Sequence, residues 1–131
     1  MLKTLAVLCV LAAGVVFIVG CSKSGGDGNV TPEAGRLSEI HEIYTSYVKK
    51  NQAPPKQFSD INSRTYSEEY PGAFGAIKEG KYVVVWGISG TDSSTVLAYP
   101  KEAAEKGGSV LMADGSIKEM TADQLQAAVK K

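Results

Sequence analysis

The sequence predicts an α+β domain in which an N-terminal amphipathic helix packs on a small antiparallel sheet of about four strands, followed by a short C-terminal helix. Three observations carry this prediction. Apolar residues recur at the helical period over residues 36–50. Runs rich in β-branched and aromatic residues, broken by turn residues, fill much of residues 81–120. A helix-capping pattern then precedes the last apolar stripe.

The first twenty residues form a separate apolar segment. Lys3 supplies one positive charge, and the run LAVLCVLAAGVVFIV from Leu5 to Val19 contains no charged residue. This order is typical of a secretory signal peptide, and the run is shorter than the roughly 18–20 apolar residues that a membrane-spanning helix needs. The alternative is an uncleaved N-terminal anchor, which also leaves the rest of the chain outside the cytoplasm.

The segment ends in Ile18-Val19-Gly20-Cys21, which resembles the lipobox of bacterial lipoproteins. The resemblance implies cleavage after Gly20 and a diacylglycerol on the Cys21 thiol, so membrane lipid is the first expected partner. Two or three acyl chains give stable anchoring where one gives only marginal binding. Ser22 stands where an Asp would mark inner-membrane retention in two-membrane bacteria, and this resemblance favours the outer membrane. We expect the protein at the cell membrane or outer membrane, facing the periplasm or the exterior.

Residues 21–35 are predicted to form a flexible tether that carries the lipid at Cys21. The stretch SKSGGDGNVTPEAG is rich in glycine and polar residues and cannot bury a core. Cys9, the other cysteine, lies within residues 1–20 and is removed with the signal peptide. The mature protein would then contain no disulfide, no cysteine metal site and no thiol nucleophile. The folded domain is expected over residues 36–131.

The first element of that domain is a predicted helix over residues 36–50. Four apolar side chains three or four positions apart share one of its faces: Leu37, Ile40, Tyr44 and Tyr47. Charged residues such as Glu39 fall mainly elsewhere and should face solvent. Upstream, Thr31-Pro32 fits a helix cap with proline in the first turn. Pro54-Pro55 should end the helix, because a residue before proline is pushed out of the helical region.

Residues 51–80 show no clear period and are left unassigned. Five aromatic and aliphatic side chains in this stretch are expected to pin loops or short helical turns to the core: Phe58, Ile61, Tyr66, Tyr70 and Phe74. The C-terminal half is more regular, with four predicted strands over residues 81–88, 95–99, 109–113 and 116–120. A polar turn over residues 89–94 joins the first two.

Alternation in the first strand sets the expected packing. Tyr82, Val84 and Trp86 form one set, and Val83 and Val85 point to the opposite face. The first helix should cover one of these sets, and the C-terminal helix should cover the other set or its edge.

Asp114-Gly115 lies between the last two strands and is predicted to form a two-residue hairpin turn, because both positions tolerate positive φ. We interpret Asp114 and Gly115 as a structural turn, since a calcium site would need several clustered oxygens. Thr121 should cap the final helix, with Gln124 as its capping-box partner. That helix has a weak apolar stripe of Ala122, Leu125, Ala128 and Val129.

The stretch GGSVLMADGSI, from Gly107 to Ile117, resembles the C-terminal signature of prepilin-like secreted bacterial proteins. In that signature a histidine, nine residues and Asp-Gly follow one another, and Ala104 stands at the histidine position here. Pro54-Pro55 and the following Phe58-Ser-Asp-Ile61 also resemble the passage from helix to loop in pseudopilin globular domains. The resemblance implies a pseudopilin-like fold, with a lipid and a tether in place of a membrane-embedded stalk.

Residues that could carry chemistry are few. The single histidine, His41, begins HEIYT, which lacks the second histidine of a zinc-protease helix, so we interpret it as a surface or helix-flank residue. Glu68-Glu69 should be solvated, because adjacent side chains do not converge on one substrate. Gly87-Ile-Ser-Gly90 leads into another strand, so no helix N-terminus is available for phosphate. The tyrosines could form a binding face, but most should belong to the core.

The formal net charge of zero argues against a nucleic-acid partner. We expect no cofactor and no metal. The expected function is that of a membrane-anchored envelope lipoprotein, a non-catalytic interaction or structural module with a protein partner in the envelope. Two alternatives stay open: an accessory component of a pilus or secretion assembly, and a hydrolase or carbohydrate-active enzyme that relies on carboxylates alone.

Overall fold

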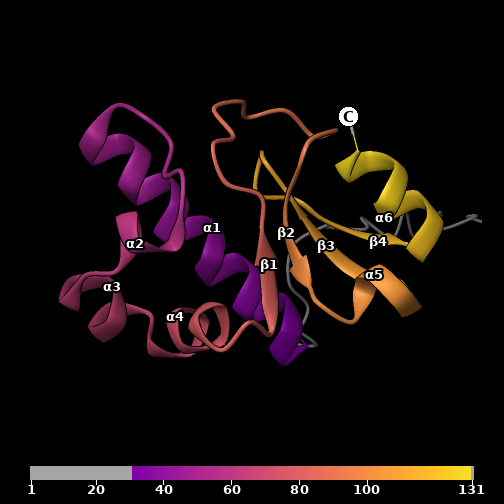
Figure 1. Ribbon diagram of the computed structural model, residues 1–131, viewed down its shortest axis with the longest axis horizontal. Coiled ribbons are helices and arrows are strands. Elements are labelled where there is room, and N and C mark those ends of the chain that lie inside the picture. The colour runs from indigo at the N-terminus through magenta and orange to yellow at the C-terminus, as the bar shows by residue number, and fades with distance from the viewer. Residues whose placement is uncertain (1–30, 131) are drawn as a thin grey trace, which may run out of the picture.

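A computed structural model describes residues 31–130 and confirms the α+β class (Figure 1). The signal segment, Cys21 and most of the expected tether lie outside the described residues. The helices are α1 (Pro32–Asn51), α2 (Phe58–Ile61), α3 (Arg64–Glu69), α4 (Pro71–Lys78), α5 (Ala103–Lys106) and α6 (Ala122–Val129). The strands are β1 (Tyr82–Val84), β2 (Val96–Pro100), β3 (Gly108–Met112) and β4 (Ile117–Met120).

Helix α1 begins earlier than predicted. The Thr31 hydroxyl accepts a hydrogen bond from the Ala34 N–H (3.2 Å), and Pro32 occupies the first turn. Residues 32–35 are therefore helical, and the expected tether boundary at residue 35 is wrong because the cap lies at Thr31. The helix ends at Asn51, and the next residue, Gln52, caps it in the left-handed conformation (φ 58°).

The predicted apolar face of α1 is buried. Leu37, Ile40 and Tyr44 are each at most 5% exposed, whereas Tyr47 is half-buried at the margin of the core. Ile43, which the sequence reasoning left out, is 1% exposed. The buried stripe is thus wider than the predicted one, as is usual for a helix that packs on a sheet.

The unassigned stretch folds into three short helices, α2, α3 and α4. The Ser63 hydroxyl caps α3 by accepting from the Tyr66 N–H (3.4 Å). Ile61, Tyr66 and Phe74 are buried, and the rings of Phe58 and Phe74 lie 5.3 Å apart. The expectation that these side chains pin the stretch to the core is confirmed.

The four strands form an antiparallel meander in the order β1-β2-β3-β4. Strand β1 is shorter than the predicted strand over residues 81–88, because the chain turns at Gly87 (φ 80°) and leaves the ladder. The Gly87 N–H donates instead to the Pro55 carbonyl (2.8 Å). In β2 the register shifts between Val96 and Ala98, so Leu97 forms a bulge and both Leu97 and Ala98 face the same cluster.

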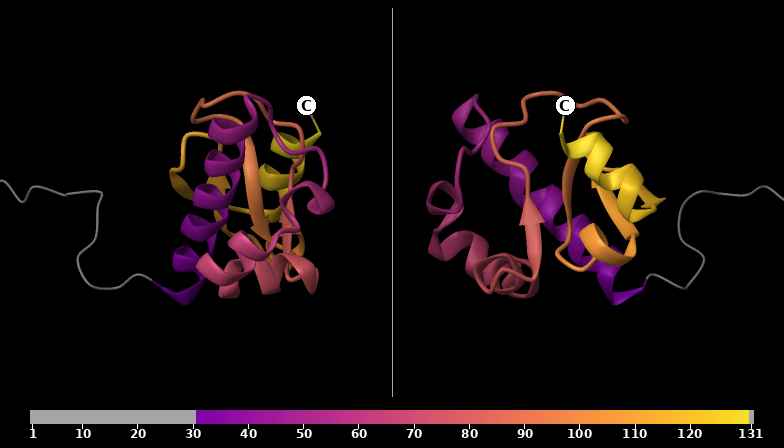
Figure 2. Two further views of the ribbon diagram at one scale, coloured as in Figure 1. Left: turned by 90° about the vertical axis from the view of Figure 1, so that its left-hand side faces the viewer. Right: turned by 45° about the vertical axis from the view of Figure 1, so that its right-hand side comes forward.

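The sheet is covered on both faces, as predicted. Helix α1 lies on one side and α6 on the other (Figure 2). Tyr82, Val84 and Trp86 pack in the cluster under α1. Val85 packs in the second cluster, whose fully buried members include Leu125 of α6.

The β3–β4 hairpin differs in detail from the prediction. Met112 and Ser116 are bonded through the Met112 N–H (2.8 Å), and the Gly115 N–H donates to the Met112 carbonyl (3.0 Å). The turn thus has three residues, Ala113 to Gly115, and Gly115 alone adopts positive φ (88°). At the next junction, Thr121 and Gln124 form the predicted capping box.

Candidate functional site

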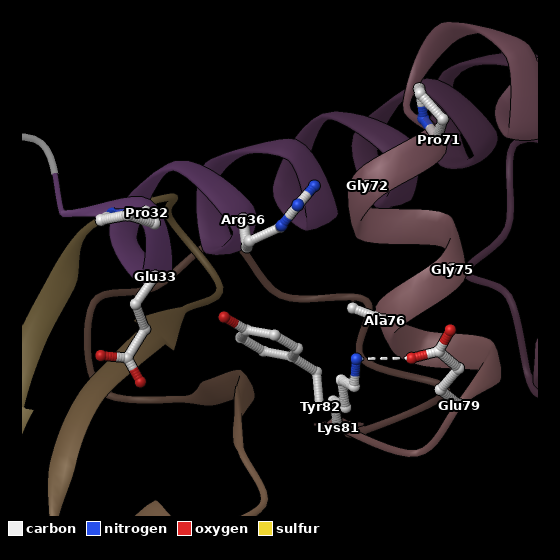
Figure 3. A pocket seen from close by; sticks show the side chains of 10 residues that line it. All are labelled: Pro32, Glu33, Arg36, Pro71, Gly72, Gly75, Ala76, Glu79, Lys81 and Tyr82. Carbon is white, nitrogen blue, oxygen red and sulfur yellow. Dashed lines mark ion pairs between the residues drawn. The ribbon is translucent and has the colours of Figure 1, made fainter.

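A large hollow of about 470 Å³ lies between the start of α1, helix α4 and the start of β1 (Figure 3). Its charged and aromatic lining consists of Glu33, Arg36, Glu79, Lys81 and Tyr82. The Tyr82 ring projects into the hollow, between Glu33 on one side and Lys81 on the other. None of these residues was singled out from the sequence as part of a site, since only the fold brings them together.

Cations and anions in this hollow are matched. Lys81 Nζ lies 2.7 Å from Glu79 Oε2, and Arg36 Nη1 lies 3.6 Å from Glu39 Oε2. The ammonium of Lys81 holds the pKa of Glu79 below its usual range, so this carboxylate is a poor proton donor at neutral pH. Burial, with the charge of Glu33, raises the pKa of Tyr82, which stays a neutral phenol. The hollow therefore offers no unpaired lysine or arginine to an anionic ligand.

Arg36 and Glu39 both contact the first turn of α4 and so connect α1 to α4. A Cβ atom at Gly72 would overlap Arg36 Nη1, so the guanidinium rests against the backbone of Gly72. Glu39 Oε2 accepts a hydrogen bond from the Ala73 N–H (3.1 Å), one of the free donors in the first turn of α4. Glu39 is therefore not the purely solvent-facing side chain that the helical period predicted.

A second, smaller pocket of about 180 Å³ lies at the other end of α1. Its walls are the last turns of α1, the loop between β1 and β2, Leu97 of β2 and Ala113 of the hairpin. The Tyr44 hydroxyl donates to the Ile88 carbonyl (2.8 Å) and ties that loop to α1. Burial raises the pKa of Tyr44. The pocket is predominantly apolar, unlike the first hollow.

Asp114 is exposed at the surface, and Gly115 beside it lies against His41 of α1. Asp114 Oδ1 accepts from the Ser116 N–H (2.9 Å) and from the Ser116 hydroxyl, and these bonds lower the pKa of Asp114. The His41 ring lies directly over Gly115, where a Cβ atom would be 2.8 Å from His41 Cε1. His41 is thus partly buried on the flank of the helix, in keeping with its interpretation from the sequence.

The remaining sequence candidates do not converge. Glu68 pairs with Arg64 (2.6 Å) on the exposed side of α3. Gly87 and Gly90 belong to the β1–β2 loop, and the element that follows this loop is strand β2, not a helix. Within residues 31–130 no group of three or more His, Cys, Asp or Glu side chains could hold a metal ion. No helix in this part of the chain is long and apolar enough to cross a membrane. Cys21 lies outside the described residues.

No family model, no curated protein and no solved structure matches this chain.

Proposed function

We propose that the protein is a lipid-anchored envelope protein whose domain serves as a non-catalytic interaction or structural module. The observation that carries the proposal is the sequence Ile18-Val19-Gly20-Cys21 at the end of an uncharged apolar run. The fold supports it, since α1 starts at Pro32 and only a short polar segment separates the lipid attachment point from a packed domain.

The chemistry of the described surface supports the non-catalytic part of the proposal. The carboxylate of Glu79 is paired with Lys81, and the oxygens of Asp114 are engaged by Ser116. In both cases the pKa is lowered, the opposite of what a general acid at neutral pH requires. His41, the single histidine, packs on a turn and has no carboxylate hydrogen-bonded to its ring among the described residues.

The anchor is tested by growing cells with an alkyne analogue of palmitate and measuring label on the full chain. The native protein should be labelled and should partition into the detergent phase. A Cys21→Ala variant should lose the label, whereas Cys9→Ala should keep it, because Cys9 is removed with the signal segment. Persistent label on Cys21→Ala would refute lipidation at that residue.

A second candidate is an accessory role in a pilus or secretion assembly, as the pseudopilin resemblance implies. The order of elements favours it: a long N-terminal helix, a connecting stretch, then an antiparallel meander packed on that helix. The distinguishing experiment is in vivo crosslinking from an exposed position such as Ser38. Crosslinks to pilus or secretion components support this role, and a pattern of crosslinks without them argues against it.

A further inference from the structure

The pocket at the far end of α1 differs from the large hollow in its balance of charges. Val48, Ile88 and Leu97 form most of its apolar wall, and Lys49 stands at its rim. No acidic side chain lines it, and the carboxylate that lies beside its rim, that of Asp92 next to Gly90, accepts hydrogen bonds from Ser94 and Thr95. Within residues 31–130 no carboxylate forms an ion pair with Lys49, whereas Arg36 and Lys81 at the large hollow are both paired.

The polar part of the rim is formed by the loop between β1 and β2. The loop residues Ser89, Gly90 and Thr91 lie along it, and in the described part of the chain their backbone N–H groups bond to no protein acceptor. The Thr45 hydroxyl is already committed to the His41 carbonyl (2.8 Å). An occupant therefore meets apolar carbon inside and one cation without an ion-pair partner at the rim, an arrangement that suits a single anionic group.

The size of the pocket limits the apolar part of the occupant. A volume of about 180 Å³ is close to that of the ~150 Å³ apolar cavities that hold one benzene molecule. A ring of six atoms or a branched chain of similar bulk fills it, and an extended acyl chain does not.

The location leaves the pocket accessible. Figures 1 and 2 show that α1 starts at one end of the domain and reaches the β1–β2 loop at the other. Val48 lies about 24 Å along the helix axis from Pro32, at 1.5 Å per residue. The pocket is therefore separated from the start of α1 by most of the length of that helix.

We infer that the pocket between α1 and the β1–β2 loop is a binding site for a small apolar monocarboxylate, with its ring or branched chain against Val48, Ile88 and Leu97 and its carboxylate at Lys49. A ligand of about ten non-hydrogen atoms in such a site should bind with a dissociation constant on the order of 1 mM. This inference does not depend on the lipid anchor.

The test uses the full chain in nanodiscs of zwitterionic phosphatidylcholine, with methyl NMR signals of Val48, Ile88 and Leu97 as the readout. Phenylacetate is the probe, and phenylacetamide is its neutral isostere. Phenylacetate should shift these signals and bind about threefold to fivefold more tightly than the amide, since an exposed ion pair contributes a modest increment. Equal affinities, or shifts confined to other parts of the domain, would overturn the inference.

Two matched variants locate the charge. Lys49→Gln should reduce phenylacetate affinity to that of the amide, whereas Lys50→Gln should change it less than about twofold, because Lys50 does not line the pocket. Val48→Phe, on the partly exposed rim, should block both probes. Equal losses of phenylacetate affinity in Lys49→Gln and Lys50→Gln would overturn the inference. It would also be overturned if the pocket bound a peptide with a C-terminal leucine but did not bind phenylacetate. Neither result would bear on labelling of Cys21.

Discussion

Gly115 is subject to two constraints, which a double-mutant cycle with His41 can separate. Its φ of 88° is costly for a residue with a Cβ atom. The same Cβ atom would also lie 2.8 Å from Cε1 and 3.1 Å from Nδ1 of His41, inside van der Waals contact. Gly115→Ala therefore strains the turn and pushes against α1 at the same time.

The two contributions have different magnitudes and different partners. The left-handed conformation costs about 1–2 kcal/mol for alanine. Displacing the His41 ring adds about 1 kcal/mol or more, as overpacking does. Gly115→Ala should therefore destabilise the domain by about 2–3 kcal/mol. In a His41→Ala background the ring is absent, and the same change should cost only the backbone strain.

Urea unfolding of the full chain, wild type and the three variants of this cycle, measures the coupling between the two positions. The coupling should be about 1 kcal/mol, with His41→Ala partly rescuing Gly115→Ala. Asp114→Asn serves as the control, since an asparagine side chain can still accept the bond from the Ser116 N–H. If Gly115→Ala cost the same with and without His41, the contact between the turn and α1 would be refuted.

Three further outcomes are expected. Ile40→Ala should cost about 2–4 kcal/mol in unfolding free energy because Ile40 is 1% exposed, whereas exposed Ser38→Ala should stay within about 0.5 kcal/mol; similar losses would contradict the assigned helix face. Glu39→Ala should lower the unfolding free energy by about 0.5–2 kcal/mol, and Glu39→Gln should lower it less, since glutamine keeps an acceptor for the Ala73 N–H. Equal melting temperatures for the wild type and both variants would contradict the role of Glu39 as a cap of α4. Hydrogen bonds from Ser94 and Thr95 lower the pKa of Asp92 to about 2. The stabilisation from these bonds is therefore complete above about pH 4 and is lost as the pH falls toward 2. NMR titration of the Asp92 carboxyl should show this midpoint, and Asp92→Asn should remove this contribution to the pH dependence of the melting temperature.

Elements stabilised by local pattern could be predicted from the sequence. The α1 face, the existence of the four strands and the Thr121–Gln124 capping box all depend on residues within a few positions of one another. The two-faced packing of the first strand also followed from alternation alone, and the structure confirms it at Val84 and Val85. Such features require no knowledge of distant contacts.

Features set by distant contacts escaped the sequence reasoning. Helices α2, α3 and α4 are four, six and eight residues long, too short for a period to show, and tertiary burial of Ile61 and Phe74 supports them. The strand prediction ran past Val84 because nothing in the run reveals that Gly87 turns toward Pro55. The contact of Arg36 with Gly72 joins residues far apart in the chain, so the large hollow could not be foreseen.

The charged side chains at the two hollows differ in whether they are already engaged in contacts that support the fold. This difference makes the smaller pocket the better candidate for a ligand-binding site. At the start of α1, Glu39 pairs with Arg36 and accepts a hydrogen bond from α4, and Lys81 pairs with Glu79. Removing any one of these side chains would break a contact within the protein, whether or not a ligand is bound. At the other end of α1, Lys49 supports no contact of this kind within the described residues. A change at Lys49 should therefore alter binding and leave the fold intact, whereas a change at Glu39 should alter the fold first. Melting curves for Lys49→Gln and Glu39→Ala decide this directly: an equal loss of stability in both would mean that Lys49 has a structural partner after all.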